Sequence, residues 1–87
     1  MERAFQSGDI VRHFKCETLS EEEKKDGRYT YRIIGVAVHS ETDEKLMVYQ
    51  ALYGEKGLFV RPLAMFLEEV DHKKYPEIKQ KYRFEKM

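Results

Sequence analysis

The sequence predicts a mostly β fold, a small SH3-like barrel of five short strands with a short helical turn before the last strand. Runs rich in Tyr, Ile, Val and Thr alternate with polar turns along the 87-residue chain, and such runs are typical of strands. The longest of them, residues 28–53, forms a hairpin that bends at a glycine. Barrel closure hides strand edges in a domain of this size. An open α+β sheet with the C-terminal segment packed on it is the alternative.

A first short strand is expected over residues 10–14, after the turn signal Gly8-Asp9. Residues 17–27 (ETLSEEEKKDG) then interrupt the strand pattern. Ser20 followed by Glu23 matches a capping box, which favours a helical turn. Because no apolar stripe would hold a longer helix on the core, we expect a loop with one helical turn, although the sequence leaves helix and loop both open.

The strongest strand signal is residues 28–40 (RYTYRIIGVAVHS). Its apolar positions change phase at Gly35, which indicates a bulge or a bend. Residues 40–45 form a polar turn, in which Asp43 is the residue best suited to a left-handed backbone. Residues 46–53 are the returning strand.

A second tight turn at 54–57 leads to a fourth strand over residues 58–61. Pro62 stops the ladder, because it lacks an N–H donor. We expect a helical turn over 63–66 and a short fifth strand over 67–70.

The whole of residues 1–87 is expected to form one domain, since no second core could be built from this length. Its barrel would span residues 7–70, and residues 71–87 would be a C-terminal extension, either a tail or a short helix. Within residues 72–82 the sequence does not decide between helix and loop. Phe84 is expected to fold back and anchor the extension.

Charge and composition exclude several classes of function. Sixteen basic and sixteen acidic residues give zero net charge, whereas proteins that hold duplex nucleic acid through its phosphates usually carry a basic excess. We therefore expect no strong duplex binding. The local basic excess of residues 72–87 is interpreted as a solvated tail. Cys16 is the single cysteine, and no long apolar run is present, so we expect no disulfide, no membrane association and a cytoplasmic location.

Several motifs resemble a bacterial family catalogued as domain of unknown function 1653. They are the stretches 11–15 (VRHFK), 31–70 and 82–84 (YRF), which include GVAVHSET, YQALYG and VRPL. The resemblance implies a small barrel-like domain and does not imply a catalytic activity. Cys16 stands where the family has a glycine and a shorter loop. Phe59 replaces a common Trp, which keeps an aromatic ring and removes an indole donor.

No catalytic or metal-binding set is visible in the sequence. Cys16 could pair with His13 or His39 as a nucleophile and base, but neither spacing brings them together. The three histidines, at positions 13, 39 and 72, lack ligand spacing, and there is no CxxC or HExxH motif. We therefore expect no enzyme, no cofactor and no metal.

The remaining chemistry is a set of polar-tipped residues on the best-defined strands, a candidate ligand-binding site: His39, Tyr49, Gln50, Tyr53 and Arg61. His39, Tyr49 and Arg61 are expected near one rim of the barrel, where a titrating ring, an aromatic face and a fixed cation would suit a small anionic or planar ligand.

Each of these side chains also has a purely structural interpretation. The two tyrosines could form the barrel wall, Gln50 could pair with the backbone, and Arg61 could be an ion-pair staple to Glu68, Glu69 or the C-terminal tail. The leading functional hypothesis is a non-catalytic binding module for a small ligand or an extended peptide. A self-associating assembly domain is the alternative, and an enzyme comes third.

Overall fold

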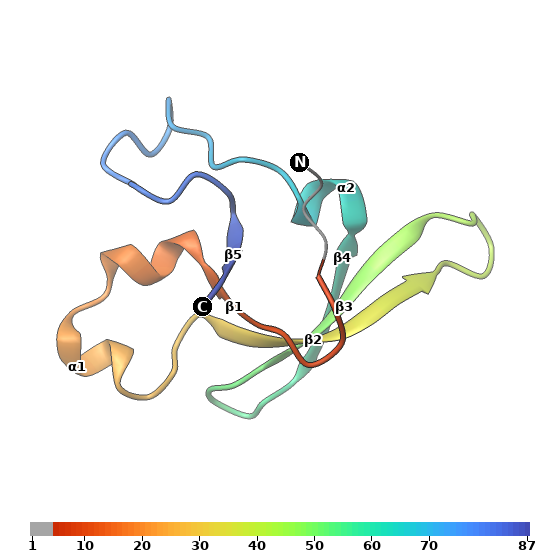
Figure 1. The fold of residues 1–87 in the computed structure, drawn as a ribbon, viewed down its shortest axis with the longest axis horizontal. Coiled ribbons are helices and arrows are strands. Elements are labelled where there is room, and N and C mark those ends of the chain that lie inside the picture. Colours follow the sequence, from red (N-terminus) through yellow and green to blue (C-terminus); the bar gives the residue numbers. More distant parts are fainter. Residues whose placement is uncertain (1–4) are drawn as a thin grey trace.

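The computed structural model of the chain describes residues 5–87 and shows a mostly β architecture with short helices (Figure 1). The strands are β1 (Ile10–His13), β2 (Thr30–Val38), β3 (Lys45–Ala51), β4 (Leu58–Pro62) and β5 (Phe84–Lys86). The helical segments are a 3₁₀ helix η1 (Phe14–Thr18) and two single-turn α-helices, α1 (Glu21–Lys24) and α2 (Leu63–Phe66). No helix in the described part of the chain is long and apolar enough to cross a membrane.

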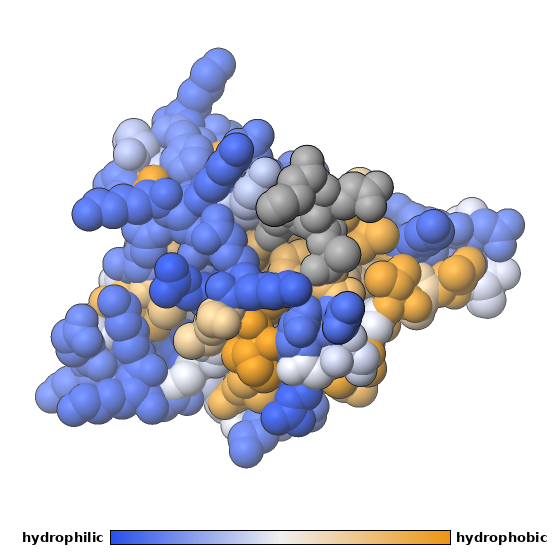
Figure 2. Space-filling view, in the orientation of Figure 1, coloured by the Kyte–Doolittle hydropathy of each residue, from blue (hydrophilic) through white to orange (hydrophobic). Residues whose placement is uncertain are grey.

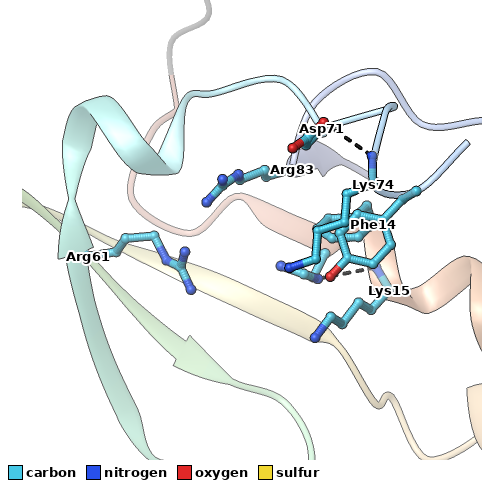
Figure 3. Close-up of a pocket in the computed structure, with 8 residues that line it drawn as sticks. Phe14, Lys15, Arg61, Asp71, Lys74 and Arg83 are labelled. Carbon is cyan, nitrogen blue, oxygen red and sulfur yellow. Dashed lines mark hydrogen bonds between the residues drawn. The ribbon is translucent and has the colours of Figure 1, made fainter. Parts of the chain in front are cut away.

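The five strands form one antiparallel sheet in the order β4-β3-β2-β1-β5. The expected mostly β class is confirmed, but the sheet is open, with β4 and β5 as its two edges, so the expected closed SH3-like barrel is not confirmed. Arg61 on β4 and Arg83 beside β5 extend into the space between these edges (Figure 3).

The central hairpin confirms the bend and the turn expected from the sequence. β2 and β3 pair from Tyr31↔Ala51 to Val38↔Lys45, and their register shifts between Ile33 and Gly35. The extra residue is a β-bulge, which bends a strand and increases its twist. Asp43 has a φ of 61° in the turn, as its short polar side chain allows.

The segment between β1 and β2 contains the expected single helical turn. Ser20 Oγ accepts a hydrogen bond from the backbone N–H of Glu23, and the Glu23 carboxylate accepts from the N–H of Ser20. This reciprocal capping box is the one that the sequence predicts. The first strand is one residue shorter than expected, because η1 begins at Phe14.

The C-terminal part differs most from expectation. Residues 67–70 contribute only an isolated bridge, Glu69↔Tyr82, and the fifth strand is instead Phe84–Lys86, which pairs with β1. Residues 84–86 are therefore part of the sheet, and Phe84 is part of its main core.

Residues 72–82 form turns and no helix. The Glu17 carboxylate accepts hydrogen bonds from the backbone N–H groups of Lys79 (2.9 Å) and Gln80 (2.6 Å), so these donors are satisfied without a helix. The Gln80 side chain is only 5% exposed and donates to the carbonyl oxygens of Arg12 and Tyr82. These bonds hold the loop against β1.

The core has two clusters. The larger lies on one face of the sheet and contains Val11, Tyr31, Ile33, Met47, Tyr49, Ala51, Phe66 and Phe84. Phe66 and Phe84 stack with ring centroids 4.1 Å apart, which confirms Phe84 as an anchor. The smaller cluster contains Phe14, Val70 and Ile78. It fixes the segment of residues 71–83 before β5, which we call the C-terminal loop.

Hydrophilic residues cover the side of the molecule that carries α1 and the C-terminal loop (Figure 2). Hydrophobic residues gather over its middle and toward the β2–β3 hairpin.

A candidate anion-binding pocket

A pocket of about 290 Å³ lies between the two edges of the open sheet. It is lined by His13, Phe14, Lys15, Arg61, Asp71, Lys74, Tyr75 and Arg83. These residues come from the end of β1, from η1, from β4, from the C-terminal loop and from the position before β5. We call this site the basic pocket.

Positive charge dominates the basic pocket. Figure 3 shows the basic ends of Arg61, Arg83, Lys15 and Lys74 directed toward one shared space. Within residues 5–87, no carboxylate lies within 4 Å of the charged nitrogens of Lys15, Arg61 or Lys74.

Two carboxylates offset part of this charge. Asp71 is the acidic lining residue, and its carboxylate accepts hydrogen bonds from the backbone N–H groups of Lys73 (3.1 Å) and Lys74 (3.3 Å). Arg83 pairs with Glu68 at 3.5 Å. Four cations and these two carboxylates leave a local charge of about +2, so the basic pocket is suited to an anion.

Arg61 is held in place by contacts that leave its charge uncompensated. Its Nε donates to the hydroxyl of Tyr49 at 3.4 Å, and its guanidinium carbon lies 5.7 Å from the centroid of the Phe84 ring. Tyr49 is 5% exposed and Phe84 1%. A long hydrogen bond and a cation–π contact orient the guanidinium group, but neither neutralises it.

His13 is neutral at physiological pH. Burial lowers its pKa to about 4, with further lowering from the charges of Arg61, Lys15 and Arg83. Its Nδ1 accepts a hydrogen bond from the backbone N–H of Lys15 at 3.2 Å. The neutral ring therefore carries its proton on Nε2, which is available as a donor.

Aromatic rings form one wall of the basic pocket. Phe14 and Tyr75 lie with ring centroids 5.0 Å apart, and the His13 ring lies 4.4 Å from that of Phe14. The Lys74 ammonium group is 5.5 Å from the Tyr75 centroid. The basic pocket thus combines cations with flat apolar surface, which suits a ligand with an anionic group and a planar part.

The structure brings together two of the five residues singled out from the sequence. Arg61 lines the basic pocket and Tyr49 positions it. His39 does not join them, because it lies in the β2–β3 turn, where its Nδ1 accepts from the N–H groups of Glu41 and Thr42. That turn is at the far tip of the hairpin (Figure 1).

Gln50 and Tyr53 also lie outside the basic pocket. The Gln50 amide donates to the carbonyl oxygen of Lys56 at 3.1 Å, so it pairs with the backbone. The Tyr53 hydroxyl is 2.9 Å from that of Tyr31. Burial, followed by this hydrogen bond, raises the pKa of Tyr31. Both side chains therefore have partners within the fold.

Sequence reasoning missed His13, Lys15, Lys74 and Arg83 as site residues. Lys74 and Arg83 belong to the basic excess of residues 72–87. That excess is typical of a solvated tail, but it is also the signal that could reveal these two residues. From the sequence, His13 is expected neither to act as a base for Cys16 nor to bind a metal, and Cys16 does not line the basic pocket. In the described residues, no three His, Cys, Asp or Glu side chains are grouped as a metal site requires.

Comparison with known proteins identifies a family match. The sequence model of the family described as "Protein of unknown function (DUF1653)" matches residues 9–86, nearly the whole chain. No curated protein and no solved structure matches significantly.

Proposed function

The chain belongs to the DUF1653 family, and we propose that it is a non-catalytic binding module for a small anionic ligand, held in the basic pocket. The observation that carries the proposal is the convergence of Lys15, Arg61, Lys74 and Arg83 on one space with few compensating carboxylates. Uncompensated positive charges repel one another and destabilise the fold unless a bound anion or solvent compensates them.

The charge and size of the basic pocket point to a phosphate ester. A local charge of about +2 matches a phosphate monoester, which carries about −1.5 to −2 at neutral pH. The Arg61 fork can bind two oxygens, and the lysines act as point charges. A volume of about 290 Å³ is at the small end of the range for ligand pockets. With Tyr75 as a stacking surface, a mononucleotide-sized ligand fits best.

We also propose that the fold is an open form of an SH3-like barrel and that the protein is cytoplasmic. A five-stranded sheet whose two edges flank a ligand pocket corresponds to an SH3-like barrel left open on one side. A cytoplasmic location agrees with a chain whose single cysteine, Cys16, has no partner for an intrachain disulfide.

The test is a calorimetric or NMR titration of the protein with AMP, adenosine and inorganic phosphate. We expect AMP to bind, phosphate to bind more weakly, and adenosine to bind least. Arg61→Gln should weaken AMP binding roughly 10- to 100-fold, because a charged hydrogen bond contributes about 1.5–3 kcal/mol.

Arg32→Gln is the matched control. Arg32 is also a strand arginine, and it is exposed where Arg61 is half-buried. Its neighbour Ile33 lies in the core, so Arg32 is on the opposite face of the sheet. An equal loss of AMP affinity in the two variants would show that only the net charge of the protein matters, and it would contradict the proposal. Absence of binding by all three compounds would contradict it as well.

A further inference from the structure

The outer backbone edge of β4 has hydrogen-bonding groups that pair with no other strand within residues 5–87. The N–H of Ala51 donates to the carbonyl oxygen of Gly57, so Gly57 and, by alternation, Phe59 and Arg61 direct their backbone groups toward β3. The N–H and C=O groups of Leu58 and Val60 therefore point away from the sheet. β4 is a terminal strand of the sheet.

The side chains on this edge are apolar and exposed. Leu58 is 65% exposed, Phe59 47% and Val60 61%. Edge strands are usually protected by charged residues, bulges or covering segments. Residues 58–60 carry no charge, and the β3–β4 register has no irregularity. Such an edge is a template for another strand.

We propose that the β4 edges of two copies of this chain pair antiparallel about Phe59 and form a symmetric dimer. In this register Leu58 of each copy faces Val60 of the other, and each pair exchanges two hydrogen bonds, so all four outward groups of each copy are satisfied. Phe59 faces Phe59 across the two-fold axis.

The ends of β4 define this register. The next outward position after Val60 is Pro62, which has no N–H to donate. Toward the N-terminal end of β4, the next outward position would be Lys56. Its φ of 57° is not a strand conformation, so Lys56 does not extend the edge. Arg61 would face Gly57 of the second copy, so no like charges oppose each other. The edge is therefore self-complementary, and this favours a second copy as its partner.

The exposed area indicates a weak dimer. Three side chains per copy, each about half to two-thirds exposed, supply well below the roughly 800 Å² per partner of a standard interface. On the outer sheet face Ile34, 42% exposed, extends the apolar surface behind Val60. We expect a dimer fraction that rises over about 10 µM to 1 mM protein.

Sedimentation velocity over this concentration range tests the proposal. Val60→Pro should abolish the concentration dependence, because it removes an outward donor that the monomer does not use and proline is tolerated on sheet edges. Val60→Lys should act likewise by adding a charge to the edge, and it covers the case in which the proline variant fails to fold. Val60→Thr, which keeps shape and donor, should dimerise like the natural sequence, and circular dichroism checks folding in each variant.

A cysteine at the symmetry axis tests the register. In a Cys16→Ser background, Phe59→Cys should form a disulfide-linked dimer under mild oxidation, because facing residues of a non-hydrogen-bonded antiparallel pair have Cα atoms close enough for a disulfide. Ile34→Cys, exposed but away from the axis, should not. A chain that stays monomeric at 1 mM, or a Val60→Pro variant that dimerises like the natural sequence, would overturn the proposal.

Discussion

Ligand binding and the ion pair with Glu68, both expected of Arg61 from the sequence, involve two different arginines, Arg61 and Arg83. Arg61 was expected either to bind a ligand or to act as a staple to Glu68, Glu69 or the C-terminal tail. In the structure the ion pair with Glu68 belongs to Arg83, at 3.5 Å. Arg61 contacts the Tyr49 hydroxyl and the Phe84 ring. Its charge is therefore available to a ligand.

His13 should make stability depend on pH. Its pKa is about 4 in the folded state and 6.5 when unperturbed, so between these values the unfolded chain binds more protons and stability rises with pH. Stability from this group is complete above pH 6.5 and is lost as the pH falls toward 4. We expect a loss of about 1–2 kcal/mol relative to His13→Asn, reduced by solvent screening of a partly exposed ring.

Chemical denaturation of both proteins at pH 7 and pH 4.5 measures this difference. Parallel pH dependence in the two proteins would contradict it. A bound anion would favour protonated His13 and raise its pKa. If the basic pocket is the binding site, sulfate, which keeps two negative charges over this pH range, should therefore bind more tightly as the pH falls from 7 toward 5.

At the scale of elements, the C-terminal loop is held by side chains in place of a helix or strand ladder. Glu17, from η1, accepts two N–H groups of this loop, 62 and 63 residues away in the sequence. The loop carries Asp71, Lys74 and Tyr75 into the basic pocket. The position of these three pocket residues thus depends on the Glu17 carboxylate, which does not itself line the pocket.

Glu17→Ala should destabilise the protein by about 2 kcal/mol, because it removes charged acceptors from two N–H groups. Glu17→Gln should cost less, since one acceptor oxygen remains. Glu22→Ala is the control: it removes an exposed carboxylate from α1 and should change stability by less than about 0.5 kcal/mol. Hydrogen exchange at the amides of Lys79 and Gln80 should accelerate only in the Glu17 variants.

At the scale of the whole molecule, β5 completes the core. Phe84 is 1% exposed, stacks on Phe66 and contacts Tyr31 and Tyr49 at ring-centroid distances of 5.9 and 5.5 Å. It also lies under Arg61. One residue near the C-terminus therefore joins the sheet, α2 and the basic pocket.

Phe84→Ala should destabilise the fold by about 3–5 kcal/mol, as is usual for a buried phenylalanine. Phe59→Ala is the matched control, because its ring is 47% exposed and should cost less than about 1.5 kcal/mol. Thermal or urea unfolding measures both. A similar loss of stability in both variants would show that Phe84 of β5 contributes no more to the core than the half-exposed Phe59.

Local patterns predicted the elements that depend on neighbours in sequence. The phase change at Gly35, the Ser20–Glu23 capping box, the turn at Asp43 and the helical turn after Pro62 are all present. Each arises from backbone geometry or from bonds within a few residues. Residues 84–86 were not predicted as a strand, because so short a run has no periodicity of its own and is formed by pairing with β1.

By itself, the sequence determined the β-rich class, the central hairpin, the turns and the family. Only the tertiary structure decided that the sheet stays open and that Arg61 meets Lys15, Lys74 and Arg83, while His39 lies at a hairpin tip. The reason is that a pocket depends on which distant segments meet. Loop closure, the Glu17 bonds to the C-terminal loop and the burial of Phe84 bring them together, and none of these leaves a periodic signal in the chain.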